Sequence, residues 1–365
     1  MNKKVGILTF HRGLSYGANL QAYGLQNFML KNGIDNEIVD YSCQDMIDRY
    51  QKIFRKTKGS KIRGLAWNLM TASSVMQKKK ATTEFVENNL RLSKGYTAQN
   101  IQNANSEYSA FITGSDQVWS PTCVGFDPVY FLTFADSSKK YSYAASIATN
   151  KIPENMKEEY IKRVGDFSAI SLREKSGAEL ITSLTGRETA VHIDPSMLLT
   201  REDWDKICCE NYPKEKYILL FTVPKPSQLV NYAIKLAEEK DLKIYFLNNF
   251  GKKVRHKRIK YLKPVGITEF ISLIKHAEYV CTNSFHGNAF SLLYHKNFVV
   301  ETAAFPKRNI RSEDLMLKLG LKHRILSSKN TPEINFKTDW SSVDSLLEND
   351  RKEALRYLQS IKEKN

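Results

Sequence analysis

The chain has 365 residues, more than one ordinary hydrophobic core supports, and this length predicts two domains. Its 42% hydrophobic and 26% charged residues exclude the disordered and fibrous classes. No apolar run approaches the ~20 residues of a membrane span. The short apolar run near the N-terminus continues into His11 and Arg12 without a cleavage site, so we expect a first β-strand there and not a signal peptide.

The five cysteines are odd in number and lack the spacing of metal ligands. Free thiols fit a reducing compartment, so we expect a cytoplasmic protein. We expect no metal site and no cofactor.

The net charge of +16 is concentrated in two stretches. Residues 49–80 contain ten basic residues and no acidic one, and residues 252–260 contain a second cluster. Such patches attract phosphates, nucleic acid or an anionic membrane face, and a solvated surface is an equal alternative. The sign of the charge does not choose among these partners.

The first half of the chain alternates strand and helix patterns. Residues 5–10 predict a strand, a glycine-bearing loop follows at 13–17, and helical spacing starts at Leu20. Gly33 ends this helix and residues 36–41 predict a strand, which completes a βαβ unit. We expect a mostly helical insertion at about 44–95. Further strands are expected at 110–113, 140–145, 169–172 and 191–193.

The second half repeats this alternation. Strands are expected at 217–223, 243–248, 279–282 and 298–301, and helices at 227–240, 267–276, 288–294 and 342–362. These elements predict an α/β fold with two Rossmann-like domains facing each other across a cleft. The expected bounds are 1–199 for the N-terminal domain, 200–335 for the C-terminal domain and 340–365 for a terminal helix.

Because ligands of such sheets bind beyond the carboxyl ends of the strands, the loops after strands are the places to search. Two such loops, at 11–19 and 113–119, follow the strands expected at 5–10 and 110–113. The first combines glycines with a helix N-terminus, which suits an anion. The second places Ser115 and Asp116 where they can grip hydroxyl groups. An ordinary turn or a turn cap is the structural alternative for each.

Two more such loops carry titratable residues. Arg173 follows a strand and offers a fork of donors to a carboxylate or phosphate, with a surface ion pair to Glu174 as the alternative. His286 lies between a strand and a helix, where Ser284 or Asn288 can cap the helix. A histidine there can exchange protons near neutral pH, although a lone histidine is more often structural.

Taken in order, these stretches resemble the polysaccharide pyruvyl transferase family. The matching pieces are Tyr16-Gly17-Ala18-Asn19-Leu20-Gln21-Ala22-Tyr23, Gly114-Ser115-Asp116-Gln117-Val118-Trp119, Tyr143-Ala144-Ala145-Ser146, Ser171-Leu172-Arg173-Glu174, Asp194-Pro195 and Asn283-Ser284-Phe285-His286-Gly287. The resemblance implies a GT-B-type fold, phosphoenolpyruvate as donor, and as acceptor a sugar of a surface polysaccharide precursor. The acceptor side is then the N-terminal domain and the donor side the C-terminal domain.

The resemblance also implies roles for individual residues. Arg173, His286 and Lys307 match the positions that hold and activate the donor. Many family members have an arginine two residues before the histidine, where this chain has Ser284. Arg308 or Arg311 can substitute for it, and Asn283 and Ser284 are further donor-binding candidates. His11, Tyr16, Asn19 and Ser115 are the candidates for acceptor binding.

The expected chemistry is transfer of an enolpyruvyl unit as a ketal, with His286 as acid–base group and Asp116 orienting or deprotonating the acceptor hydroxyl. The acceptor is carried on a nucleotide or a lipid diphosphate, and in the second case residues 49–80 can rest on anionic lipid at the inner membrane face.

Two other functions remain open at this stage. A GT-B glycosyltransferase with a nucleotide-sugar donor needs an acidic residue that reads the ribose, for which Glu301 is the candidate. A nucleic-acid-binding protein fits the charge, but no nucleic-acid motif supports it, so we expect no nucleic-acid partner.

Overall fold

The computed structural model describes residues 4–48, 61–123, 126–149, 151–223, 228–248, 253–302, 310–333 and 337–364. Contacts divide the chain into two compact units. Unit 1 comprises Met1–Leu198 and Asp350–Asn365, and unit 2 comprises Leu199–Asn349. Within the described residues, no helix combines the length and the apolarity that a bilayer crossing requires.

Unit 1 is built on a five-stranded parallel sheet in the order β3-β2-β1-β4-β5, the strand order of a Rossmann fold. A two-stranded parallel pair, β6 and β7, continues from β5 through single bridges at Ala169 and Leu172. The strands are β1 (Val5–Leu8), β2 (Asn36–Tyr41), β3 (Leu92–Tyr96), β4 (Ala110–Thr113), β5 (Lys140–Ser142), β6 (Ser171–Leu172) and β7 (Ala190–Val191). The α-helices are α1 (Tyr16–Lys31), α2 (Gln44–Met46), α3 (Lys61–Asn89), α4 (Lys157–Val164) and α5 (Lys175–Thr185).

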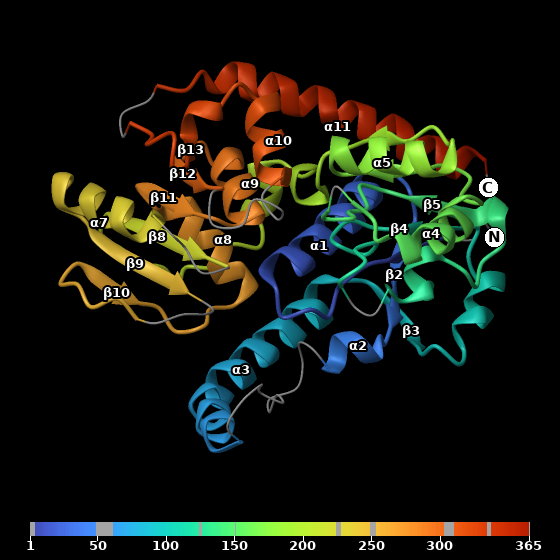
Figure 1. Cartoon of the computed structure of the whole chain (residues 1–365), viewed down its shortest axis with the longest axis horizontal. Helices are drawn as coiled ribbons and strands as arrows, with labels where there is room; N and C mark the ends of the chain where they lie inside the picture. Colours follow the sequence, from blue (N-terminus) through green and yellow to red (C-terminus); the bar gives the residue numbers. More distant parts are fainter. Residues whose placement is uncertain are drawn as a thin grey trace. The chain divides into compact units, whose positions relative to one another are not determined.

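The predicted strands of unit 1 are confirmed, with shorter bounds for several of them. The range 44–95 contains α2 and the long helix α3, which projects from the unit 1 sheet in Figure 1. The last residues of the range 44–95, however, form β3 at the edge of the sheet. The helical expectation misses this strand because Leu92–Tyr96 contains a lysine and a glycine and only Tyr96 in it is buried.

Unit 2 is built on a six-stranded parallel sheet in the order β10-β9-β8-β11-β12-β13, again a Rossmann order. Its strands are β8 (Tyr217–Thr222), β9 (Lys243–Asn248), β10 (Ile259–Tyr261), β11 (Tyr279–Thr282), β12 (Asn297–Glu301) and β13 (Ile325–Leu326). Its α-helices are α6 (Arg201–Asp205), α7 (Leu229–Glu239), α8 (Ile267–His276), α9 (Phe285–Leu293) and α10 (Ile310–Lys318). The four predicted strands are confirmed, whereas β10 and β13 at the two edges were not predicted.

The terminal helix α11 (Trp340–Glu363) belongs to both units, since its residues up to Asn349 lie in unit 2 and those from Asp350 lie in unit 1. In unit 1, Tyr357 donates from its hydroxyl to the carbonyl of Ser142 at 2.8 Å. Arg351 donates from Nε to the carbonyl of Met197 at 3.0 Å. The second half of the helix is therefore an integral part of unit 1.

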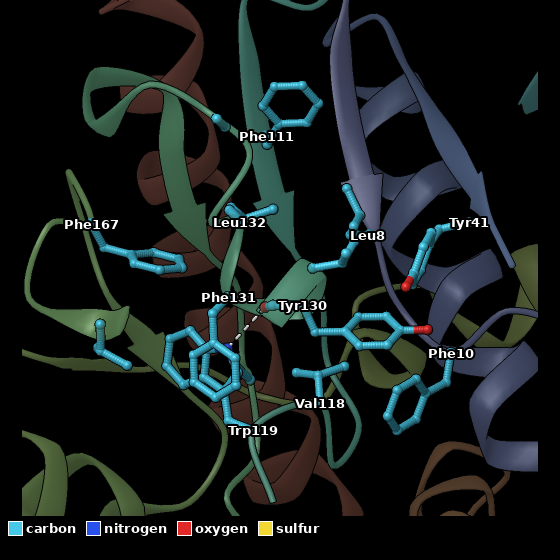
Figure 2. Packing of buried hydrophobic residues seen from close by; sticks show 14 of the residues in the cluster. Leu8, Phe10, Tyr41, Phe111, Val118, Trp119, Tyr130, Phe131, Leu132 and Phe167 are labelled. Carbon is cyan, nitrogen blue, oxygen red and sulfur yellow. Dashed lines mark hydrogen bonds between the residues drawn. The ribbon is translucent and has the colours of Figure 1, made fainter. Parts of the chain in front are cut away.

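An aromatic cluster in the core of unit 1 anchors the loop after β4 (Figure 2). Trp119 is fully buried, stacks on Phe131 at 5.6 Å between ring centroids, and donates from its indole N–H to the carbonyl of Tyr130 at 3.0 Å. Val118 is buried beside it. The apolar end of the 114–119 segment thus fixes the position of Ser115 and Asp116 at the sheet edge.

Candidate functional site

In unit 1 the loops after β1, β4, β6 and β7 all start at the carboxyl ends of parallel strands. Because parallel strands point the same way, these loops lie on the same side of the unit. The sequence-predicted residues of this unit lie in or next to these loops. They are His11, Tyr16, Asn19, Ser115, Asp116 and Arg173.

The loop after β1 is held by an ionic cluster with the end of β2. Arg12 donates to both carboxylate oxygens of Asp40, each at 2.7 Å, and His11 Nε2 lies 2.9 Å from Asp40 Oδ1. Burial alone would raise the pKa of the Asp40 carboxyl, but hydrogen bonds from Arg12 and His11 hold that pKa well below its usual range. His11 therefore has a structural partner in addition to its predicted acceptor role.

The other two acceptor candidates of this loop have structural contacts as well. Asn19 donates from Nδ2 to the carbonyls of Gly13 (2.8 Å) and Ser15 (2.9 Å), which fixes the turn before α1. Tyr16 is the first residue of α1, and Lys78 from α3 lies over its ring, with Nζ 4.6 Å from the centroid. Burial lowers the pKa of Lys78 to about 8. Helix α3 therefore covers the start of α1 and brings a cation there that the sequence did not reveal.

A small hollow of about 60 Å³ opens between the loop after β1 and the segment after β2. Its lining joins polar groups of the first loop to apolar side chains, and consists of Thr9, His11, Arg12, Tyr41, Ser42, Cys43, Met46, Ile47 and Tyr130. Only His11 in this set was predicted as a site residue. Arg12 lies in the predicted loop at 11–19, and the other lining residues come from segments without a recognisable motif.

The loop after β4 has an unusual backbone at Asp116, whose φ of 76° lies in the left-handed region. Residues other than glycine adopt this conformation at a cost of about 1–3 kcal/mol, and such residues gather at functional sites. Asp116 Oδ1 accepts a hydrogen bond from the Gln117 N–H at 2.9 Å. Ser115 is fully buried, and its hydroxyl donates to Asp194 Oδ2 at 3.3 Å.

Arg173 lies within a group of carboxylates. It is buried and forms an ion pair with Asp194, and its Nε lies 4.0 Å from Glu174 Oε2. Burial alone would lower the pKa of the Arg173 guanidinium, but the carboxylates of Asp194, Glu174 and Asp116 outweigh it and raise that pKa above its usual value. Arg173, Asp116 and Ser115 are thus brought together, in surroundings whose net charge is negative.

Glu174 forms the ion pair with Arg173 that was considered from the sequence, but the pair is buried and not on the surface, and Glu174 is also held by hydrogen bonds of its own. Its Oε1 accepts from the Ser146 hydroxyl (2.8 Å) and from the N–H groups of Ile147 (2.9 Å) and Ala148 (3.0 Å). The stretches 143–146 and 171–174 therefore act as one buried network, in which a carboxylate orders the loop after β5.

In unit 2 the candidate site surrounds the N-terminus of α9, at the carboxyl end of β11. Ser284 is the N-cap residue, with its hydroxyl accepting from the Gly287 N–H at 3.4 Å. Asn283 Oδ1 accepts from the Val223 N–H at 2.9 Å and ties the loop to the end of β8. Both predicted donor-binding residues therefore position the start of the helix. No acidic residue occurs in the first turn of α9, so the positive end of the helix dipole is not offset there.

His286 lies in that first turn and is only 8% exposed. The guanidinium of Arg311 lies 5.6 Å from the ring centroid of Phe285, the residue before it. Unit 2 thus brings His286 and Arg311 to the start of one helix. Lys307 and Arg308, the other two predicted cations, lie outside the described residues. Arg173 belongs to unit 1, so the convergence of Arg173 with His286 stays a prediction.

Comparison with known proteins decides the family. A family model described as polysaccharide pyruvyl transferase matches residues 16–302, which is most of the chain. The chain belongs to the polysaccharide pyruvyl transferase family. It is therefore an enzyme, a transferase, as the motifs predicted. A search of curated proteins finds no match.

Solved structures resemble this chain in fold. The S. aureus MnaA–UDP co-structure matches with a TM-score of 0.50 at 13% identity, covering 96% of this chain and 91% of that one. A UDP-N-acetylglucosamine 2-epimerase from Rickettsia bellii matches with a TM-score of 0.50 at 12% identity, covering 99% and 96%. These matches confirm the GT-B-type α/β fold.

The matched range contains every predicted site residue except His11, Lys307, Arg308 and Arg311. Arg311 therefore stands on its position beside Phe285 and not on the family match. Ser284 caps α9, a task for which the arginine that the family resemblance led us to expect at this position has no acceptor oxygen.

Proposed function

We propose that this enzyme transfers an enolpyruvyl unit from phosphoenolpyruvate to a sugar of a surface polysaccharide precursor, forming a pyruvate ketal and releasing phosphate. The observation that carries this proposal is the start of α9, where His286 and Arg311 flank a helix N-terminus without an acidic residue. Phosphoenolpyruvate bears a phosphate and a carboxylate, and both groups suit a helix N-terminus and a guanidinium.

The reaction needs a proton at one carbon and a leaving group at its neighbour. In the proposed sequence, protonated His286 gives its proton to the methylene carbon of phosphoenolpyruvate, and positive charge develops at the central carbon. A sugar hydroxyl bonds to that carbon and loses its proton to a base, for which Asp116 is the candidate. The C–O bond to phosphate then breaks, and a second hydroxyl of the same sugar closes the ketal and releases its proton.

Every step of this reaction moves protons or forms and breaks C–O bonds. The reaction involves no net oxidation or reduction of the two substrates. No redox group is needed, so we propose phosphoenolpyruvate as the co-substrate with no further cofactor. An N–H group on Nη1 of Arg173 is bound to Asp194. In this proposal Arg173 therefore binds the donor only through its other guanidinium N–H groups.

The acceptor side of the proposal rests on unit 1. Asp116 sits beside Ser115 at the sheet edge, and carboxylates and hydroxyls are the groups that bind sugar hydroxyls. We propose that the acceptor is carried on a nucleotide or a lipid diphosphate. The enzyme then works in the cytoplasm, and in the lipid case the basic range 49–80, of which 49–60 lie outside the described residues, contacts the inner membrane face.

A nucleotide-sugar glycosyltransferase is the alternative, and Glu301 was its candidate for reading a ribose. In unit 2, Glu301 is fully buried, and its Oε1 accepts from the N–H groups of Gln228 (2.6 Å) and Leu229 (3.0 Å) at the start of α7. This carboxylate therefore caps a helix, which favours the pyruvyl transfer reaction over the alternative.

Phosphate release tests the proposal. The enzyme is incubated with phosphoenolpyruvate and with acceptors that contain galactose, mannose or N-acetylhexosamine, and free phosphate and the ketal are measured. We expect phosphate and ketal in equal amounts with at least one acceptor. Calorimetric titration with phosphoenolpyruvate and with UDP-sugars separates the two candidates, because binding of UDP-sugars alone would favour the glycosyltransferase.

A further inference from the structure

A run of basic side chains follows one edge of the unit 2 sheet. Strand β10 is the edge strand, and residues 253–263 run into and through it. This segment contains no acidic residue. Its cations are Lys253, Arg255, Lys257, Arg258, Lys260 and Lys263, and we call them the β10 basic edge.

Most of these charges have no counter-ion. Arg258 forms an ion pair with Asp241 at 2.9 Å. For the other five cations, no ion pair to a carboxylate occurs within the part of the chain that the structure describes. All five are exposed: Lys253, Arg255, Lys257, Lys260 and Lys263. Five exposed cations thus lie within eleven residues of one segment without an ion pair to a described carboxylate, although such like charges repel one another.

Contacts with tyrosines hold this segment in place. The Tyr261 hydroxyl accepts from the Val254 N–H at 2.6 Å. Lys253 Nζ lies 5.4 Å from the Tyr261 ring centroid, and Lys260 Nζ lies 5.1 Å from that of Tyr245. Val254, between two of the cations, is 38% exposed. The surface therefore combines ordered positive charge with one exposed apolar side chain.

Protection of a sheet edge explains only part of this charge. A lysine on an edge strand prevents pairing with another sheet, and Lys260 can do so from within β10. Lys253, Arg255 and Lys257 precede the strand and contribute nothing to that protection. These three cations need another explanation.

We propose that the β10 basic edge binds the anionic phospholipid surface of a membrane. Clusters of lysine and arginine beside an apolar side chain suit a headgroup layer, where charge is diffuse and a side chain such as Val254 can enter the interface. A single-stranded nucleic acid would also seek exposed rings for base stacking. The Tyr261 ring, however, already stacks on Phe246, with centroids 5.1 Å apart, and lies beneath Lys253.

This surface lies in unit 2 and is distinct from the basic range 49–80 of unit 1. The proposal does not depend on the pyruvyl transfer reaction, because membrane binding is measured without substrates. Failure of one proposal is therefore distinguishable from failure of the other.

The experiment is flotation of the full chain with vesicles of phosphatidylcholine alone or mixed with phosphatidylglycerol. The test variant carries Lys253→Gln, Arg255→Gln and Lys257→Gln. The control variant carries Lys322→Gln, Lys329→Gln and Lys337→Gln, which removes the same charge from exposed positions elsewhere in unit 2. Thermal unfolding confirms that both variants are folded, and phosphate release in solution checks that the active site is unaffected.

We expect the unchanged chain to bind only vesicles with phosphatidylglycerol, and to bind less as salt rises. The test variant should lose on the order of fivefold in partition coefficient for each cation removed, or roughly 100-fold in all, while the control variant stays near the unchanged chain. The proposal is overturned if the unchanged chain does not bind anionic vesicles, or if the test variant binds as the control does. Binding of a single-stranded oligonucleotide that needs these cations, without vesicle binding, also overturns it and assigns the surface to nucleic acid.

Discussion

In both units the predicted site residues lie at the carboxyl ends of parallel strands, but their electrostatic surroundings are opposite. In unit 1, Arg173 is buried among Asp194, Glu174 and Asp116, and carboxylates outnumber the cation. In unit 2, the first turn of α9 has no acidic residue and His286 lies beside Phe285, over which Arg311 packs. Two Rossmann-like sheets with the same order of central strands therefore offer a ligand surroundings of opposite charge.

Under the proposed function, we expect this difference to decide which unit binds which substrate. A trianionic donor is repelled by a group of carboxylates and attracted by a helix N-terminus and a guanidinium. Sugar hydroxyls are neutral and can donate hydrogen bonds to carboxylates. The comparison thus favours unit 2 for phosphoenolpyruvate and unit 1 for the acceptor, with Arg173 as a residue whose first partner is Asp194.

The largest expected effect tests the unit 2 side. His286→Ala should lower kcat for phosphate release by about 10²–10⁴-fold, because the acid–base group is lost. The fold should be unchanged by circular dichroism. His295→Ala in the same unit, where His295 pairs with Asp344 at 2.8 Å, is the matched control and should keep normal turnover. Near-normal activity of His286→Ala would remove this histidine from the mechanism.

The next effect tests whether Arg173 is chiefly a structural cation. Asp194→Ala leaves the buried guanidinium without its main partner and should lower the free energy of unfolding by about 3–5 kcal/mol, measured by denaturant titration. The double variant Arg173→Met with Asp194→Leu should recover most of that loss, since both buried charges are gone. If Arg173→Met alone abolishes donor binding without any loss of stability, the comparison between the units is wrong for this residue.

Arg311 gives a smaller effect on the donor alone. Arg311→Gln should raise the KM for phosphoenolpyruvate about 10–100-fold, which corresponds to the loss of one hydrogen bond to a charged group, about 1.5–3 kcal/mol. The KM of the acceptor should stay unchanged. Lys322→Gln, an exposed cation of the same unit, serves as the control.

A second change sharpens the test of Arg311. Ser284 is the N-cap residue of α9, so Ser284→Arg added to Arg311→Gln returns a guanidinium to the start of this helix and should restore part of the donor affinity. No recovery, together with an unchanged KM in Arg311→Gln alone, would show that Arg311 does not hold the donor.

The smallest effect concerns the cap of α9. Ser284→Ala removes the hydroxyl that accepts from the Gly287 N–H and should lower the free energy of unfolding by about 1 kcal/mol. Ser284→Thr keeps an acceptor oxygen and should stay within a few tenths of a kcal/mol of the unchanged chain. If the alanine variant instead loses donor affinity with no change in stability, Ser284 binds the donor directly.

Local patterns were sufficient to predict the central strands of both sheets. Strands such as β8 and β11 are continuous apolar runs between polar loops, as expected for strands covered on both faces. Strands β3, β10 and β13 lie at sheet edges. Strands β3 and β10 mix charged or small residues with apolar ones, and β13 has only two residues, too few for a recognisable pattern. They form because a neighbouring strand offers its backbone, and that is not visible in a local window.

The candidate site divides in the same way. The ordered motifs predicted the family, the GT-B-type fold and the loops that carry Asp116, Arg173 and His286. Neither the motifs nor the spacing showed that Asp194 neutralises Arg173, that Glu301 caps α7, or that Lys78 covers Tyr16.

The amino-acid order alone therefore determined the central strands, the two Rossmann-like repeats and the family, because hydrophobic periodicity and short motifs are properties of neighbouring residues. Only the tertiary structure decided which charges meet. Asp40 lies 28 residues from Arg12, and Glu301 lies 73 residues from Gln228. Such pairs arise where separate loops converge at the edge of a folded sheet, and their energies depend on burial and distance that no stretch of sequence contains.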